Sequence, residues 1–138
     1  MKRRLYLDTS AYLSVLLAQD GSEQLSRETI GAQLLSSVLL VLETRRNLVR
    51  LARQGMLNAE QYKDAIECLD QDIRLFTLRD VTLDLCQSNP LPAVTTPRSL
   101  DLAHIRTALW FHAAEPIDRF VTLDLPQRLA ARELGLPV

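Results

Sequence analysis

Short apolar runs alternate along the chain with longer segments of helical periodicity, and this alternation constrains the fold more than any other feature. Helices between consecutive strands return the chain to the same end of a sheet, which makes the strands parallel and covers both faces. The sequence therefore predicts an α/β fold with three layers, α/β/α, around a mostly parallel central sheet of about four to five strands. The expected strands are residues 2–7, 34–39, 73–78 and 119–123, with 136–138 as a candidate short edge strand.

The helices between these strands are predicted from hydrophobic spacing and from residues typical of helix ends. Ser22, Asn58 and Asp80 are expected N-caps, and Gln61 follows Asn58 at the spacing of a capping box. Gly55 is expected to end a helix in the left-handed conformation. The predicted helices are 10–18, 22–32, 42–54, 58–72, 80–86, 99–113 and 126–135.

The composition is that of a globular protein. The chain has 138 residues, of which 47% are hydrophobic and 24% charged, so we expect one domain, 1–138, with a packed core and no disordered tract. A net charge of −1 does not by itself indicate a nucleic-acid-binding protein. Lys2 and Lys63 are the only lysines; the other basic residues are arginines, whose guanidinium groups suit contacts to phosphate or carboxylate.

The cysteines and the apolar runs bear on location. Cys68 and Cys86 lie in apolar helical patterns without a CxxC spacing, so we expect reduced core residues and no structural zinc site. No apolar run approaches the roughly 18 residues of a membrane span, and the first strand is too short for a signal-peptide core. We therefore expect a cytoplasmic protein without a membrane segment.

Four acidic residues occupy equivalent places in the predicted architecture. Asp8, Glu43 and Asp124 each end an apolar run, and Asp101 opens a helix behind Ser99. The carboxyl ends of parallel strands share one edge of a sheet, where ligands bind. Carboxylates that converge there repel one another and favour a bound cation.

Each acid also has an ordinary structural role open to it. Asp8 is a good N-cap for the following helix, with Ser10 as a rival cap, and Asp124 is a candidate cap for the helix that Pro126 opens. Thr122 lies on the same side of the pleat as Asp124, so both side chains are expected at the strand-end edge.

Glu43 shares a helical face with arginines. A local ion pair with Arg46 is the simplest role for it, and the alternative is that it points into an acidic site. Arg46, Arg50 and Arg53 form a stripe that is either a solvated face or a contact for a nucleic-acid backbone.

Asp101 and His104 lie on the inward face of their predicted helix. An inward acid needs a partner, and His104 is a candidate for it. His104 is otherwise a core histidine with its own hydrogen bond or, less favoured, a metal ligand.

Several segments resemble a known family in the order and spacing of their motifs. Residues 5–11, Leu-Tyr-Leu-Asp-Thr-Ser-Ala, look like the opening motif of PIN-domain nucleases. The later blocks of that family resemble residues 37–46, 98–104, 120–124 and 130–136. The resemblance covers the whole chain, and at this length it is nearest to the VapC-type toxins of toxin–antitoxin pairs.

The resemblance implies an Mg²⁺- or Mn²⁺-dependent ribonuclease that hydrolyses RNA. It implies Asp8, Glu43, Asp101 and Asp124 as metal-binding and catalytic acids, with Asp118 as an alternative in the fourth position. Thr9, Ser10 and Thr122 would be supporting hydroxyls that orient a carboxylate or a water. It also implies a homodimer that is inhibited by a small cognate antitoxin.

Two other classes compete with this interpretation. A PIN-fold module that binds RNA or protein without cleaving it would most simply lack one of the acids, and all four are present. A receiver-type signalling domain would have adjacent acids after the first strand and a late lysine, whereas Thr9 follows Asp8 and no lysine follows Lys63. The sequence therefore favours the nuclease.

Overall fold

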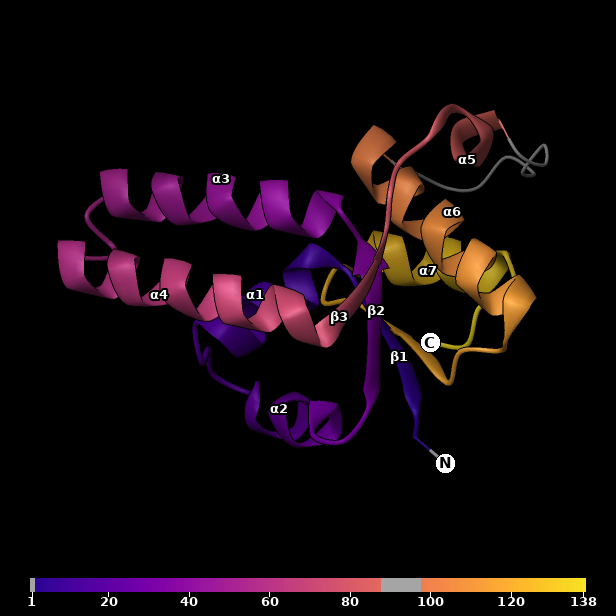
Figure 1. Cartoon of the computed structure of the whole chain (residues 1–138), viewed down its shortest axis with the longest axis horizontal. Helices are drawn as coiled ribbons and strands as arrows, with labels where there is room; N and C mark the ends of the chain where they lie inside the picture. The colour runs from indigo at the N-terminus through magenta and orange to yellow at the C-terminus, as the bar shows by residue number, and fades with distance from the viewer. Residues whose placement is uncertain (1, 88–97) are drawn as a thin grey trace.

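Four parallel strands form the sheet in the computed structural model, which describes residues 2–87 and 98–138 (Figure 1). The strands lie in the order β3-β2-β1-β4, so β1 and β2 are central and β3 and β4 are the edges. Their bounds are β1 (Arg4–Leu7), β2 (Gln33–Ser37), β3 (Phe76–Arg79) and β4 (Arg119–Val121). The predicted parallel α/β fold is confirmed.

Helices connect the strands and cover both faces of the sheet. Figure 1 shows α1 to α4 on one side and α6 and α7 on the other. The first group is α1 (Thr9–Leu16), α2 (Glu23–Thr29), α3 (Leu39–Arg53) and α4 (Ala59–Asp72), which continues into the 3-10 turn η1 (Ile73–Leu75). The second is α5 (Leu83–Gln87), α6 (Ser99–Ala114) and α7 (Leu125–Glu133).

The pleat of β1 divides the core into two parts. Tyr6 packs with Phe120 and Ile105 under α6 and α7, whereas Leu7 packs with Leu25 under α1 and α2. The Tyr6 and Phe120 rings stack with centroids 5.3 Å apart. Because both faces of the sheet are covered, β1 reads as a continuous apolar run rather than an alternating one.

The predicted boundaries of β2 and β3 are wrong. β2 ends at Ser37 and α3 begins at Leu39, so the predicted start at residue 42 is too late. Leu40 and Leu48 are buried on one face of α3, which shows that the apolar run there has helical spacing. The predicted strand 73–78 begins only at Phe76, because η1 extends α4 through the first three positions.

Several predictions at helix ends are corrected or confirmed. Asp80 does not cap α5, because Thr82 stands before that helix and its Oγ1 accepts a hydrogen bond from Leu85 N (3.4 Å). The capping box of Asn58 and Gln61 is present, with bonds of 2.8 and 2.9 Å. Gly55 has the expected positive φ of 75° after α3.

The C-terminal residues 136–138 do not form the candidate edge strand. Leu136 packs into the core, and Pro137 O accepts a hydrogen bond from Phe120 N (2.7 Å). This backbone hydrogen bond to β4 is present in place of the repeated pairing of a strand.

Both cysteines are exposed, which contradicts their predicted place in the core. On α4 the inward positions belong to Ala65 and Leu69, and Cys68 lies just off that face. On α5 only Leu85 is buried. Among residues 2–87 and 98–138, no helix is long and apolar enough to cross a membrane.

Two N-cap positions allow a matched stability test. We expect Asn58→Ala to lower the free energy of unfolding by about 1 kcal/mol, because it removes the side-chain half of the capping box. Ser22 stands at the N-cap of α2 without a side-chain capping bond, so Ser22→Ala should cost less than half as much. Urea unfolding of both variants measures the difference, and equal losses would contradict this account of the caps.

Candidate functional site

One cavity of about 230 Å³ lies where the strands end, and all four predicted acids line it. They come from four different places: the end of β1, the second turn of α3, the first turn of α6 and the start of α7. The lining residues are Asp8, Thr9, Ser10, Leu13, Glu43, Asn47, Asp101, His104 and Asp124.

Asp8 both caps α1 and faces this cavity, so its two predicted roles coexist. Its Oδ1 accepts hydrogen bonds from Ala11 N (3.0 Å) and Ser10 Oγ (2.7 Å). Its Oδ2 accepts a short bond from Thr122 Oγ1 at the end of β4. Burial raises the pKa of Asp8, while the Thr122, Ser10 and Ala11 bonds and the neighbouring His104 act to lower it. The carboxylate is thus fixed in orientation before any ligand binds.

The Thr122 hydroxyl also reaches the next acid along the chain. Its Oγ1 accepts a hydrogen bond from Asp124 N (3.0 Å), and Ser10 Oγ lies 3.3 Å away. Asp124 stands at the N-cap position of α7, but its side chain makes no capping bond. The predicted capping role of Asp124 is therefore wrong.

Glu43 is held by His104 and Thr9 rather than by an arginine. His104 Nε2 lies 2.8 Å from Glu43 Oε1, and Thr9 Oγ1 donates to the same oxygen at 2.9 Å. Burial alone would raise the pKa of Glu43, but the hydrogen bond and charge of His104, with the Thr9 bond and the charge of Arg46, lower it overall. Glu43 Oε2 accepts no bond from any described residue.

His104 is buried and bridges the core to the cavity. Its Nδ1 lies 2.7 Å from the hydroxyl of Tyr6, which is fully buried in β1. His104 is therefore the hydrogen-bonded core histidine that the sequence favoured, but its acidic partner is Glu43 and not Asp101.

Asp101 feels the charges of the other three acids. Burial raises the pKa of Asp101, and the charges of Asp124, Asp8 and Glu43 raise it further, whereas His104 lowers it. The carboxylates of Asp101 and Asp124 accept no side-chain hydrogen bond within the described part of the chain. The acids therefore converge closely enough to oppose each other's ionisation.

The oxygen-rich lining suits a hard divalent cation, because Mg²⁺ and Mn²⁺ prefer carboxylate oxygens and retained waters. The mutual repulsion at Asp101 and the unpaired oxygens of Asp101, Asp124 and Glu43 fit such an ion. In residues 2–87 and 98–138, however, no three His, Cys, Asp or Glu side chains are already arranged around a common ion position.

Asp118, the alternative fourth acid, lies at the other end of the strands, where β1 and β4 begin. Its Oδ2 accepts a hydrogen bond from Arg4 N (2.7 Å) at the start of β1, so it does not reach the cavity. The sequence reasoning missed Tyr6 and Asn47. Tyr6 read as core because it sits inside an apolar run, whereas Asn47 follows Glu43 by one helical turn, a spacing that could have pointed to it.

The arginines predicted as a stripe on α3 are exposed. Arg50 bonds to side chains of its own helix, at 2.9 Å to Asn47 Oδ1 and 3.3 Å to Gln54 Oε1. Asn47 lines the cavity, so the stripe begins one side chain away from it. A contact of Arg46, Arg50 and Arg53 with RNA stays a prediction.

No family model and no curated protein matches this chain.

The raised pKa of Asp101 predicts in which direction removal of its charge changes the melting temperature. An acid whose pKa is raised on folding lowers stability once the pH exceeds its unfolded value. Asp101→Asn should therefore raise the melting temperature at pH 7 by roughly 1–2 °C, a small gain because solvent screens the repulsion at this partly exposed position. The gain should shrink as the pH falls towards about 3, below the usual aspartate pKa of about 3.9, where the carboxyl is mostly protonated in both states.

Differential scanning calorimetry at both pH values measures this gain. Asp80→Asn is the control, because it removes the same charge at an exposed position outside the cavity and should leave the melting temperature unchanged. An equal gain in the control would contradict local repulsion as the cause.

Proposed function

We propose that this protein is a metal-dependent endoribonuclease that hydrolyses phosphodiester bonds in RNA. The observation that carries the proposal is the convergence of Asp8, Glu43, Asp101 and Asp124 on one cavity at the carboxyl edge of a parallel sheet. Structural caps and surface ion pairs have no reason to converge from four separate elements, whereas a cation site requires it.

The four acids are the residues that would hold Mg²⁺ or Mn²⁺. When bound, such an ion lowers the pKa of a coordinated water and stabilises negative charge that develops on the phosphate. The protein would position the ion and the RNA, and hydrolysis by an activated water would need no covalent intermediate on a side chain.

The supporting residues hold two of the acids in place. Ser10 and Thr122 fix both oxygens of Asp8. His104 and Thr9 both bond to Oε1 of Glu43, which leaves Oε2 for a ligand. Hydrogen bonds from neighbouring side chains of this kind orient carboxylates that would bind a metal ion.

We further propose that the chain acts in the cytoplasm as the toxin of a toxin–antitoxin pair, as a homodimer with a cognate antitoxin. The support is the order of its motifs, which resembles VapC-type PIN domains over the whole length. The single-domain size and the compact parallel fold are compatible with that class.

A second candidate is a PIN-fold module that binds RNA or protein without cleaving it. One observation favours it: no three acidic or imidazole groups of the described residues are gathered around one ion position. The two candidates differ in cleavage and in their response to divalent ions.

We expect Asp8→Asn, Glu43→Gln and Asp101→Asn each to reduce cleavage of a single-stranded RNA in Mg²⁺ or Mn²⁺ by at least about 100-fold, since even supporting residues of metal sites are worth 10- to 100-fold. Circular dichroism should report an intact fold. Asp118→Asn is the matched control at the end of the sheet where the strands begin, away from the cavity, and should retain activity. Full cleavage by folded Asp8→Asn and Asp101→Asn proteins would refute the site.

Divalent ions should raise the melting temperature of the wild type, because an ion that binds only the folded state stabilises it by mass action, by about 2.7 kcal/mol at 100 times Kd. Thermal melts in millimolar MgCl₂ or MnCl₂, against KCl at equal ionic strength, measure the shift. The shift should be smaller in Asp101→Asn. Equal shifts in both proteins would argue against an ion at Asp101, and no shift in the wild type would favour the non-cleaving module.

A further inference from the structure

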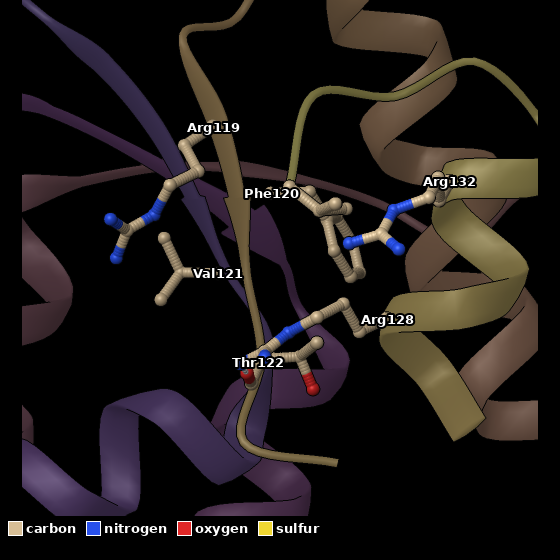
Figure 2. A pocket seen from close by; sticks show the side chains of 7 residues that line it. Arg119, Phe120, Val121, Thr122, Arg128 and Arg132 are labelled. Carbon is tan, nitrogen blue, oxygen red and sulfur yellow. Dashed lines mark hydrogen bonds between the residues drawn. The ribbon is translucent and has the colours of Figure 1, made fainter. Parts of the chain in front are cut away.

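A second cavity, of about 290 Å³, lies along the outer edge of β4 and is lined by three arginines. Arg119 belongs to the strand itself, and Arg128 and Arg132 come from α7. Figure 2 shows Arg119 on one side of β4, with Arg128 and Arg132 reaching towards the strand from the other. Three guanidinium groups thus lie around the outer side of one edge strand.

The two arginines of α7 form no ion pair in the described part of the chain. They stand four residues apart on one helical face, where like charges repel. Both are exposed, and neither forms an ion pair with a carboxylate of residues 2–87 or 98–138. Arg119, in contrast, pairs with Glu28 at 3.1 Å. The free positive charge of the cavity is therefore that of Arg128 and Arg132.

Thr122 connects this cavity to the acidic one. Its backbone O accepts a hydrogen bond from Arg128 Nη2 (3.1 Å), while its side chain donates to Asp8 Oδ2. Thr122 also lines the arginine cavity, and Asp8 lines the acidic one. A chain of negative charges that leaves the acidic cavity past Thr122 would therefore meet the Arg128 guanidinium group, which bonds to the same residue.

We propose that Arg128 and Arg132 form a phosphate-binding subsite that holds the RNA backbone beside the scissile bond. The inference rests on the proposed ribonuclease function and deepens it, by giving the substrate a path from the acids across the edge of β4. Arg119 stays with Glu28 and shapes the cavity.

Phosphate fits this cavity better than the carboxylates of an acidic protein. A guanidinium fork donates two parallel hydrogen bonds to phosphate and to carboxylate alike, but a nucleic-acid strand repeats its charge at the regular short intervals that two arginines one helical turn apart can follow. The link through Thr122 to a site proposed to cut phosphodiesters favours the same ligand. An acidic peptide is the competing occupant, and the experiment separates the two.

The test measures binding of a fluorescein-labelled single-stranded RNA of twelve nucleotides by anisotropy, in EDTA so that no cleavage occurs, over a series of KCl concentrations. The variant is Arg128→Gln/Arg132→Gln. The control is Arg27→Gln/Arg74→Gln, which removes the same charge from exposed positions on α2 and η1, outside both cavities. A labelled hexaglutamate peptide is the second probe.

We expect the pocket variant to bind RNA roughly tenfold more weakly and the slope of log K against log [KCl] to become shallower by about 1.4, or about 0.7 per lost phosphate contact. The control should match the wild type. Unchanged RNA binding in the pocket variant, an equal loss in the control, or a loss of hexaglutamate binding without a loss of RNA binding would each overturn the subsite.

This outcome is separable from that of the proposed function. Weaker RNA binding in the pocket variant, beside a wild type that never cleaves RNA in Mg²⁺ or Mn²⁺, would refute the ribonuclease and support the subsite. Cleavage by the wild type with no change of binding in the pocket variant would overturn the subsite alone.

Discussion

The pairing of β1 with both of its neighbours is the constraint on which the rest of the molecule depends. Tyr6 is in register with Leu35 of β2 and with Phe120 of β4. Neighbouring residues of this one strand face opposite sides of the sheet: Tyr6 points under α6 and reaches His104, while Leu7 packs under α1 and α2. Asp8, just past the strand, faces the cavity. A one-residue slip of β1 would exchange the two faces and dismantle both halves of the site.

The surroundings of two acids in the cavity shift their pKa values in opposite directions. Glu43 has a hydrogen-bonded imidazole and a hydroxyl, which keep it ionised despite partial burial. Asp101 has neighbouring negative charges instead, and its ionisation is opposed. Repulsion among acids of this kind lowers stability, as functional sites often do, and the apolar packing of β1, α6 and α7 offsets the loss.

The features that could be predicted from the sequence are those that depend on residue type and local spacing. The capping box at Asn58, the left-handed Gly55 and the parallel sheet follow from residue type and spacing, and so does the meeting of the four acids at one edge. The predictions were wrong where tertiary packing sets the outcome. β2 ends at Ser37 because the first turn of α3 buries Leu40. Cys68 lies one position away from the buried Leu69 on α4. The Glu43–His104 contact joins residues 61 apart, so no local pattern could reveal it.

The buried Tyr6 hydroxyl has one more consequence, for the proton on the neighbouring ring. Burial raises the pKa of Tyr6 well above its usual value, so the phenol keeps its hydrogen at every physiological pH. In a neutral His104 ring, Nδ1 then accepts that hydrogen and Nε2 carries the other, pointing at Glu43. The Tyr6 contact thereby favours the tautomer of a neutral His104 ring in which Nε2 donates its hydrogen to Glu43 in the cavity.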